Sequence, residues 1–478
     1  MACAHRAPLM STIDLSALQQ QLHAAGQDHL WPHVDKLSGA ARAALLQRLA
    51  ALDLRLVQEL GALMSLGAGA SAPTFEPPEV FDLEERTSQR AREATQAGQE
   101  LLSQGKVGYL LVAGGQASRL GYEGPKGCFP IGPVTGRSLF EIFARRLHAV
   151  RKRYGVQTPW YVMTSEGNDA HTRAFFAQHH HFGLPADEIV FFSQAMLPAL
   201  DSHGRILMAS PTELFLAPNG HGGSLLALQS SGALRTAGER GVEVFSYFQV
   251  DNPLAPPADP LFLGLHALDG AQMSSKVVKK RDAWEKVGVL GKVDGKLSCI
   301  EYSDLPEQLR LETNEHGELR YSAGNIALHV IERAFVERLV SGRLELPWHI
   351  AKKKIPTIDA QGQPTSVDGC KFETFVFDAL ALTERSTIVE VERRHEFSPV
   401  KNKDGDDSPA TTRRDLCAMH ATWAAEAGVA LPPADAHGNV QIEIDPMYAE
   451  SAQEFAARGP KHRMTHSQGG HYYGEAHP

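Results

Sequence analysis

The chain has 478 residues and a formal net charge of −9, because 56 Asp and Glu residues outnumber 47 Lys and Arg residues. This length excludes a single small module, and the acidic balance argues against a nucleic-acid-binding protein, which needs a basic face to neutralise phosphates. A hydrophobic content of 43% excludes disordered and fibrous classes, and no apolar run is long enough to cross a membrane.

Cysteine use and the first residues predict a cytoplasmic protein. The cysteines are scattered and form no CxxC pair, which is typical of reduced thiols and not of a disulfide framework or a zinc site. They are Cys3, Cys128, Cys299, Cys370 and Cys417. The segment Met1–Ser11 also lacks the basic-then-apolar pattern of a secretory signal.

The first hundred residues are expected to be helical, because leucines recur at steps of three and four. Leu15, Leu18 and Leu22 share one face, and a second series runs from Leu45 to Leu60. A further helix, rich in Glu, Arg and Gln, is expected at about 83–103. We assign residues 1–104 to a helical N-terminal region.

From residue 105 strands and helices alternate, which predicts an α/β domain with a mostly parallel sheet and helices on both faces. The expected strands are 108–113, 160–164, 189–193 and 244–250, and the expected helices are 138–153, 169–178 and 261–268. Ser138 and Glu141 form a capping box at the first of these helices. Shorter polar strands at 276–280, 287–293 and 297–302 indicate an antiparallel addition that walls one side of a pocket.

The last hundred residues are expected to complete this domain and to form a smaller one. A helix at 371–382 closes the central domain, which we place at 105–383. A strand at 387–392 and the charged loop 401–407 belong to a C-terminal domain at 384–478. The tail beyond Arg458 is polar and is expected to be poorly ordered.

The strongest functional signal is the glycine-rich segment Leu111–Gly121 (LVAGGQASRLG), which follows the first strand of the central domain and precedes Gly124–Gly127 (GPKG). Small residues at this position let backbone N–H groups approach phosphates or a planar base. Arg119 and Lys126 would add positive charge over the same loop. The spacing excludes the GxGxxG and GxxxxGK[ST] motifs. A tight turn that carries two solvated cations is the alternative interpretation.

Asp251 is a second candidate, because it ends the apolar run 244–250. In an open α/β sheet the carboxyl ends of the strands line the ligand crevice. A carboxylate there suits Mg²⁺ shared with a substrate phosphate. An Asp that starts a turn or caps a helix fits the position equally well.

The other clusters indicate less. His221 lies in the loop Ala217–Gly223 (APNGHGG) without a partner at metal-ligand spacing, so a solvated or stacking ring is favoured. His179–His181 are expected to close a helix. The basic runs Lys352–Lys354 and Lys401–Lys403 are typical of solvated charge. No Ser-His-Asp or Cys-His arrangement is evident.

Taken together, these segments resemble the UDP-sugar pyrophosphorylases (UDPGP type 1 family), whose signature is an apolar strand, Gly-Gly-x-Gly-Thr-Arg-Leu-Gly and, three residues later, Pro-Lys-Gly. The chain is most similar to the eukaryotic-type UDP-N-acetylglucosamine pyrophosphorylases. The motifs that follow the family's order are Phe192–Ala199, Ala217–Gly223, Val250–Asn252, Lys276–Val278, Val287–Val289, Glu301–Ser303, Ala323–Ala327, Lys352–Pro356, Phe375–Asp378 and Glu396–Asn402. The segments Ala24–Leu30 and Ile442–Pro446 resemble its ends, so the resemblance covers nearly the whole chain.

This resemblance implies a uridylyltransferase that makes UDP-sugar and pyrophosphate from UTP and a sugar 1-phosphate, most closely N-acetylglucosamine 1-phosphate. The sugar phosphate would attack the α-phosphorus in line, with Mg²⁺ as cofactor and with neither nucleic acid nor membrane as partner. The implied fold is a Rossmann-like nucleotidyltransferase domain with a mixed sheet, a helical N-terminal region and a small α+β C-terminal domain.

The resemblance also assigns roles to single residues. Arg119, Lys126 and Lys401 would bind the phosphates as catalytic cations, and Asp251 would hold Mg²⁺. Gly288, Glu301 and Asn325 would contact the sugar. The nucleotide would be bound by Gly114, Gly115, Gln194, Pro218, Gly220 and His221.

Two positions depart from the family pattern. Ala117 stands at the third loop glycine, beside Ser118 in place of the usual Thr, and His221 stands where the N-acetylglucosamine enzymes have Asn beside the base. If position 117 required a positive φ or a very close approach of phosphate, alanine would cost roughly 1 kcal/mol or more and weaken UTP binding.

Two alternative functions stay open. A pyrophosphorylase for glucose 1-phosphate or for many sugars shares the Gly121–Gly124 sequence more closely. A non-catalytic UDP-sugar-binding protein is more remote, because the full set of charged residues is present. A GT-A glycosyltransferase is rejected, because Asp251–Pro253 (DNP) lacks an Asp-x-Asp arrangement.

Overall fold

A computed structural model describes residues 13–64, 73–342, 346–435, 438–459, 463–465 and 470–474. The chain divides into two compact units, each built from separated segments. The first comprises 1–72, 196–220 and 347–374, and the second comprises 73–195, 221–346 and 375–478. The three-part division at residues 104 and 383 stays a prediction, and the expectations for Cys3 and Met1–Ser11 fall outside the described residues.

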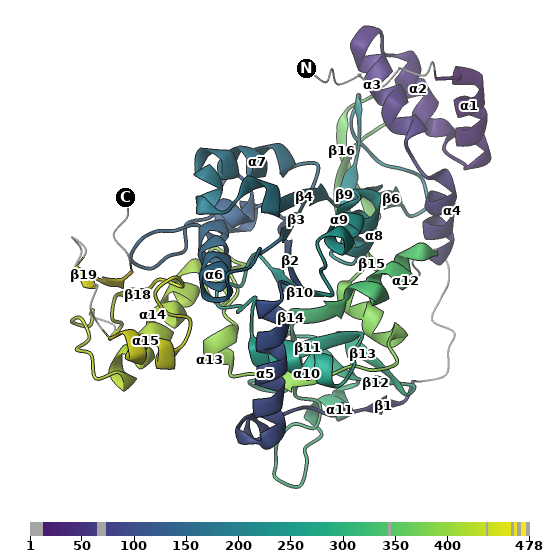
Figure 1. Cartoon of the computed structure of the whole chain (residues 1–478). Helices are drawn as coiled ribbons and strands as arrows, with labels where there is room; N and C mark the ends of the chain where they lie inside the picture. The colour runs from purple at the N-terminus through teal and green to yellow at the C-terminus, as the bar shows by residue number, and fades with distance from the viewer. Residues whose placement is uncertain are drawn as a thin grey trace. The chain divides into compact units, whose positions relative to one another are not determined.

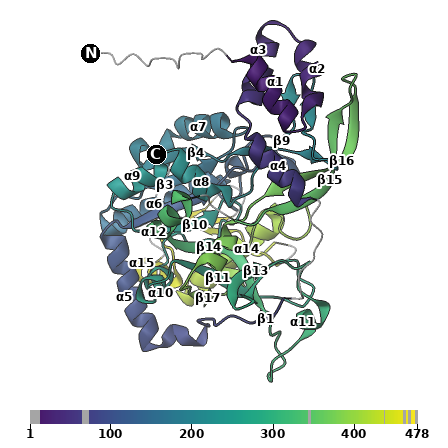
Figure 2. The same cartoon turned by 90° about the vertical axis from the view of Figure 1, so that its right-hand side faces the viewer.

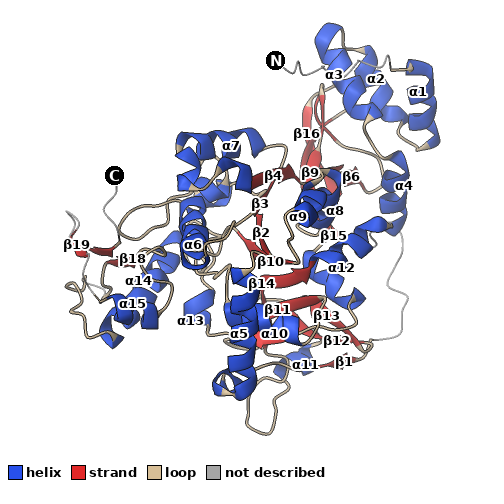
Figure 3. Cartoon of the chain, viewed as in Figure 1, coloured by secondary structure: helices blue, strands red, loops and turns tan. Residues whose placement is uncertain are grey.

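The first unit joins short helices to a long hairpin. The helices are α1 (Leu15–Ala24), α2 (Trp31–Asp35), α3 (Gly39–Ala50) and α4 (Leu54–Leu63), with a 3₁₀ turn at Asp28–Leu30 (Figure 1). Leu18, Leu22 and Leu49 are buried as the leucine spacing predicts, and they share a core with Phe372. The hairpin consists of β15 (His349–Ile358) and β16 (Pro364–Glu373), with β6 (Leu200–Asp201) beside β16 (Figure 3). Two small pairs complete the unit: β5 (Met196–Pro198) with β9 (Leu216–Pro218), and β7 (Met208–Ser210) with β8 (Glu213–Leu214).

The second unit is organised around a ten-stranded mixed sheet with the order β1-β12-β14-β10-β2-β3-β4, from which β11, β13 and β17 branch. Its strands are β1 (Phe75–Glu76), β2 (Val107–Val112), β3 (Trp160–Thr164), β4 (Ile189–Ser193), β10 (Val244–Gln249), β11 (Met273–Lys279), β12 (Val289–Val293), β13 (Lys296–Ile300), β14 (Ala323–Glu332) and β17 (Ile388–Glu390). Strands β10, β2, β3 and β4 are parallel, whereas β14 is antiparallel to β10. The predicted α/β fold with a mixed sheet is confirmed.

Helices cover both faces of this sheet. Successive residues of a strand point to opposite faces, so neighbouring residues of β2 pack against different helices. Tyr109 and Leu111 of β2 share a core with α5 (Gln89–Ser103), α6 (Leu139–Tyr154), α7 (Asp169–Gln178) and α10 (Pro260–Leu268). Leu110 shares a core with α8 (Gly223–Ser230), α9 (Ala233–Glu239) and α12 (Arg333–Ser341). Helices α5 and α10 lie side by side (Figure 2). Ser138 caps α6 by accepting a hydrogen bond from Glu141 N at 3.1 Å.

The cysteines in the described ranges form no disulfide bonds with one another. Cys128, Cys299, Cys370 and Cys417 are free thiols. Among the helices in the described ranges, none has the length and apolar character that crossing a bilayer requires.

The helix predicted at 371–382 is wrong. Residues 371–373 complete β16, and only Val376–Leu382 forms a 3₁₀ helix. Phe372 packs in the core of the first unit, whereas Val376 packs in that of the second. The helical spacing of the apolar residues therefore arose from two separate elements that meet where the chain passes between units.

The expectation of a poorly ordered tail is also wrong where the structure describes it. Strands β18 (Ile442–Ile444), β19 (Arg463–Thr465) and β20 (His471–Tyr473) form a sheet beside α14 (Pro409–Glu426) and α15 (Ala452–Arg458) (Figure 1). Tyr472 and Tyr473 are buried. Burial of two aromatic rings stabilises a strand that the neighbouring His and Gly residues made look unstructured.

An ion network joins this sheet to the central domain. Asp445 is fully buried and accepts a hydrogen bond from Arg145 Nε at 2.6 Å and one from Tyr472 Oη, and Arg137 Nη1 lies 3.3 Å away. Burial alone would raise the pKa of Asp445, but Arg145 and Arg137 outweigh it and lower the pKa. Glu443 accepts hydrogen bonds from Val134 N and Thr135 N, which fixes the loop before α6.

We expect Asp445→Asn to lower the free energy of unfolding by about 3 kcal/mol at pH 7, because it leaves buried guanidinium groups without their counter-charge. The pKa of Asp445 is lower in the folded protein than the value of about 3.9 in the unfolded chain. The contribution of its carboxylate to stability is therefore fully present above about pH 3.9 and is lost as the pH falls through the lower pKa of the folded state. Urea denaturation of both proteins between about pH 3 and pH 7 should show the difference in their free energies of unfolding disappearing in acid. The control Glu239→Gln, in an exposed pair with Arg235, should cost less than about 1 kcal/mol; an equal loss in both variants would contradict the prediction.

Candidate functional site

Side chains that follow β3 donate hydrogen bonds to the backbone of the glycine-rich loop after β2. Ser165 Oγ donates to Gly114 O at 2.8 Å, and Asn168 Nδ2 donates to Ala113 O at 2.9 Å and to Gly115 O at 3.3 Å. Both side chains are buried. Sequence reasoning missed Ser165 and Asn168, although their position directly after a buried parallel strand was a usable signal.

Gly114 and Gln194, both of which the resemblance assigns to the nucleotide, lie next to each other. A Cβ atom on Gly114 would lie 2.4 Å from Gln194 Nε2 and would displace that amide, whereas a Cβ on Gly115 would meet nothing within 4 Å. Gln194 follows β4, and its N–H donates to Thr164 O at 3.0 Å. The loop therefore presents an open backbone at Gly115 beside a buried amide side chain.

Ala117 fits the loop without backbone strain. Its φ is −93°, and its side chain is buried in the hydrophobic core. The positive φ angles of the loop fall on Gly121 (+71°) and Gly124 (+133°). Position 117 therefore does not need a positive φ, whereas the effect of Ala117 on a closely approaching phosphate stays a prediction.

Lys126 and Asp251 form the charged centre of the site. Lys126 Nζ lies 3.4 Å from Asp251 Oδ2, and the two side chains are 19% and 14% exposed. Lys126 N also donates to Gly115 O at 3.1 Å, which ties this lysine to the glycine-rich loop. The carboxyl end of β10 and the loop after β2 thus meet at one edge of the sheet.

The donor chemistry at Asp251 fits Mg²⁺ shared with a substrate. In the described ranges no three His, Cys, Asp or Glu side chains are arranged to hold a metal ion by themselves. Mg²⁺ is commonly bound through one or two carboxylates together with substrate phosphates and water. A single carboxylate beside a lysine satisfies that requirement.

Lys401 is placed near this centre by the backbone of the residue before it. Val400 N donates to Asp251 O at 2.8 Å. Lys401 Nζ lies 3.5 Å from Asp407 Oδ2 and 5.7 Å from the centre of the Phe397 ring. The side chain is 46% exposed, so a phosphate could compete with Asp407 for it.

The C-terminal loop also approaches the glycine-rich loop. A Cβ on Gly121 would lie 3.7 Å from Lys403 Cδ. Arg119 is exposed on the 3₁₀ turn Ser118–Leu120 of the same glycine-rich loop. Lys403 of the C-terminal part therefore lies beside the glycine-rich loop that carries Arg119.

The three residues assigned to the sugar lie together. Asn325 N donates to Gly288 O at 2.8 Å, and a Cβ on Gly288 would lie 3.6 Å from Glu301 Oε1. Cys299 Sγ is 3.6 Å from Asn325 Nδ2 and 2.9 Å from that same Cβ position. Sequence reasoning did not place Cys299 here. Burial raises the pKa of its thiol, so it is a neutral wall of the site.

His221 has the stacking role favoured by its sequence context. Its ring stacks on Phe375 with centroids 5.1 Å apart and meets Phe377 edge-on at 5.5 Å. Nδ1 accepts a hydrogen bond from Val376 N at 3.1 Å. The ring thus belongs to an aromatic cluster at the start of α8.

Pro218 and Gly220 belong to the first unit. Pro218 ends β9, and Gly220 has a φ of +81° with a Cβ position 2.3 Å from Thr374 O, so glycine is required there. Their contact with the nucleotide stays a prediction. Lys352–Lys354 are exposed on β15, and His179 closes α7, as expected.

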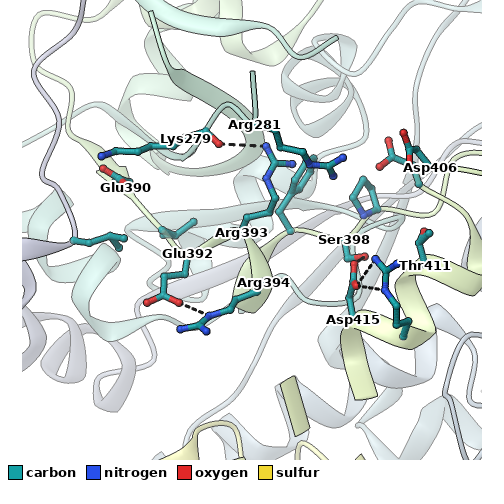
Figure 4. A pocket seen from close by; sticks show the side chains of 16 residues that line it. Lys279, Arg281, Glu390, Glu392, Arg393, Arg394, Ser398, Asp406, Thr411 and Asp415 are labelled. Carbon is teal, nitrogen blue, oxygen red and sulfur yellow. Dashed lines mark hydrogen bonds and ion pairs between the residues drawn. The ribbon is translucent and has the colours of Figure 1, made fainter. Parts of the chain in front are cut away.

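A separate cavity of about 620 Å³ borders the loop of Lys401, but no residue of the glycine-rich loop lines it. Arg394 there pairs with Glu392 at 2.6 Å, and Arg414 pairs with Asp415 at 2.8 Å (Figure 4). Arg393 pairs with Glu285 at 2.9 Å. With these arginines neutralised by acids, the cavity lacks the excess positive charge of a phosphate site.

The chain is similar to known proteins over most of its length. The model of the family described as UTP–glucose-1-phosphate uridylyltransferase matches residues 74–462. UDP-N-acetylhexosamine pyrophosphorylase-like protein 1 of Mus musculus is 37% identical over 445 residues, which cover 88% of this chain and 87% of that protein. UDP-N-acetylglucosamine diphosphorylase 2 of Arabidopsis thaliana is 34% identical over 466 residues, covering 93% and 92%.

A solved structure agrees with these relatives. The uridine diphosphate N-acetylglucosamine pyrophosphorylase of Trypanosoma brucei, in complex with an inhibitor, matches with a TM-score of 0.79 and 28% identity over 94% of this chain and 95% of that chain. The resemblance inferred from the sequence motifs is confirmed. The chain belongs to the UTP–glucose-1-phosphate uridylyltransferase family.

Proposed function

We propose that the protein is a UDP-N-acetylglucosamine pyrophosphorylase, which converts UTP and N-acetylglucosamine 1-phosphate into UDP-N-acetylglucosamine and pyrophosphate. Family membership supports uridylyl transfer, and the names of the relatives support the amino sugar. The observation that carries the proposal is the meeting of Lys126, Asp251 and the Val400–Lys401 backbone at the end of β10, beside the glycine-rich loop. We also propose a cytoplasmic location, in keeping with the free thiols of the described cysteines.

The residues present suit a reaction without a covalent intermediate. A phosphate oxygen of the sugar substrate attacks the α-phosphorus of UTP in line, and pyrophosphate leaves. Gly115 offers its exposed backbone, and Lys126 and Arg119 offer positive charge to the triphosphate. Catalysis of this kind depends on positioning and on neutralising charge that shifts toward the leaving group.

Asp251 would hold Mg²⁺, which when bound neutralises phosphate charge. Asp251 is mostly buried and lies beside Lys126, so the carboxylate has a fixed orientation before the substrate arrives. Lys401 would meet the diphosphate after exchanging its contact with Asp407 for a phosphate oxygen.

A second candidate is a pyrophosphorylase for glucose 1-phosphate or for several sugars. It is favoured by the description of the family model, which names glucose 1-phosphate, and by the Gly121–Gly124 sequence. Glu301 and Asn325 can bond the ring hydroxyls of either sugar. A non-catalytic binding protein has no observation in its favour, because Lys126, Asp251 and Lys401 are all in place.

A pyrophosphate-release assay with UTP and a panel of sugar 1-phosphates tests the proposal. We expect kcat/KM for N-acetylglucosamine 1-phosphate to exceed that for glucose 1-phosphate by about tenfold or more, because glucose leaves a polar partner of the acetamido group unpaired. Equal or better use of glucose 1-phosphate would favour the second candidate. Release with none of the sugars would refute a uridylyltransferase.

Lys126→Ala should lower kcat by about a hundredfold or more, because removal of a charge-stabilising donor costs about 3 kcal/mol in the transition state. The fold should persist, since Lys126 Nζ contacts the acid Asp251 and belongs to no hydrophobic core. The matched control Lys296→Ala removes an exposed lysine at the start of β13 and should keep the wild-type rate. A Lys126→Ala enzyme with normal turnover would remove this role.

Asp251→Asn should raise the half-saturating Mg²⁺ concentration and depress kcat, because an amide keeps the shape but loses the charge that binds the cation. Titration of activity against Mg²⁺ measures both effects. The control Asp187→Asn, at an exposed carboxylate, should leave the titration curve unchanged. An unchanged curve for Asp251→Asn would place the metal elsewhere.

A further inference from the structure

The second unit contains a buried lysine that the proposed reaction does not use. Lys276 lies on β11, and its side chain is only 1% exposed. Nζ lies 2.6 Å from Asp259 Oδ2 and 2.6 Å from Glu396 Oε2, with the Phe262 ring centre 5.3 Å away. Burial opposes the charge on Lys276, but the two carboxylates outweigh it and raise its pKa. A permanent positive charge therefore links two separate acids inside the protein.

Glu396 is the first residue of segment 396–400, which directly precedes Lys401. Glu396 ends α13 (Arg393–Glu396), and its backbone carbonyl accepts a hydrogen bond from Asn252 Nδ2 at 2.7 Å. Asn252 Oδ1 accepts one from Ser398 N at 3.1 Å, and Val400 N donates to Asp251 O at 2.8 Å. Three hydrogen bonds thus pair residues 396–400 with Asp251 and its neighbour.

The other acid belongs to the helix layer. Asp259 caps α10 by accepting a hydrogen bond from Leu261 N at 3.0 Å. On the far side of the turn, Arg146 of α6 donates to Pro253 O at 3.1 Å. The turn after β10 is therefore held from two sides. Helix α6 bonds it directly through Arg146, and segment 396–400 bonds it through Asn252 and Asp251. Lys276 of β11 in turn ties this segment, through Glu396, to Asp259 at the start of α10.

We propose that Lys276 is a positioning residue for uridylyl transfer: through Glu396 it fixes the spacing between Asp251 and Lys401. This inference rests on the proposed function, in which those two residues bind the metal and the diphosphate. Without the ammonium, Asp259 and Glu396 would face each other as largely buried carboxylates that have lost the counter-charge they share. Their repulsion would displace segment 396–400 and, with it, Lys401.

The test compares four variants. Lys276→Met removes the charge but keeps the length of the side chain, and Glu396→Gln weakens the ion pair with little change of shape. Lys276→Arg keeps the charge. Lys279→Met is the matched control, because Lys279 lies on the same strand but is 55% exposed and pairs with exposed Glu318.

Amide hydrogen exchange in the absence of substrate measures directly how firmly segment 396–400 is held. The amides of Ser398 and Val400 should exchange about tenfold faster or more in Lys276→Met and Glu396→Gln, because the hydrogen bonds that protect them open locally. Lys276→Arg should stay close to the wild type, and Lys279→Met should be unchanged.

Steady-state kinetics measure the effect of the same substitutions on the reaction. In Lys276→Met and Glu396→Gln, kcat should fall about tenfold to a hundredfold, because a displacement near 1 Å of a group that binds reacting phosphates has that effect. The half-saturating Mg²⁺ concentration should rise, whereas KM for the sugar 1-phosphate should stay within about twofold. Half-saturating concentrations do not depend on the folded fraction of the enzyme, so this pattern separates positioning from a simple loss of stability.

If Lys276→Met does not fold, Glu396→Gln decides the question with the same measurements. Unchanged exchange at Ser398 and Val400 would overturn the proposal, and so would faster exchange with wild-type kcat and Mg²⁺ dependence. A wild-type protein that releases no pyrophosphate would refute the proposed function, and exchange would then still decide whether Lys276 holds segment 396–400.

Discussion

The parallel pairing of β2 with β10 determines where the chemistry of this protein can take place. The two strands pair from Val107 and Val244 through Val112 and Gln249, and Val250 N continues the ladder to Val112 O at 3.1 Å. Because paired parallel strands end at the same edge, the glycine-rich loop and Asp251 emerge side by side. Lys126, which begins a 3₁₀ turn after the glycine-rich loop, then reaches Asp251.

The rest of the charge is brought to this edge from the C-terminal part of the chain. Segment 396–400 is bonded to Asp251 and Asn252, so Lys401 follows the turn after β10 as if it were part of the same element. Such local assembly explains how a chain with a net charge of −9 can handle phosphates. The field that a substrate meets depends on the side chains within a few ångströms, not on the sum over the surface.

The sequence predicts those parts of the fold that depend on local pattern. The buried strands Trp160–Thr164 and Ile189–Ser193 have the expected bounds, because continuous apolar runs between loops admit few other structures. The helix expected at 371–382 fails for the opposite reason: apolar spacing does not reveal that Phe372 and Val376 pack in different cores.

The same limit applies to the candidate site. Gly114, Lys126 and Asp251 could be named because motif and strand position identify each of them. Cys299 and Lys276 could not, because their roles arise from Asn325 and Glu396, which the pairing of distant segments brings near. Ala117 shows that even a motif departure needs the backbone angle before its cost can be judged.

The phosphate and sugar residues lie on different parts of the sheet. Lys126 and Asp251 follow parallel strands, whereas Gly288 and Asn325 lie at β12 and β14, where the pairing is antiparallel and β14 is irregular opposite β11 between Ser275 and Val277. A substitution around Asn325 can therefore alter the shape of the sugar pocket without moving the charges that act on the α-phosphorus. Under the proposed assignment of Gly288, Glu301 and Asn325 to the sugar, the preference between glucose and N-acetylglucosamine would depend on residues at the antiparallel strands, and the phosphate chemistry on residues after the parallel ones.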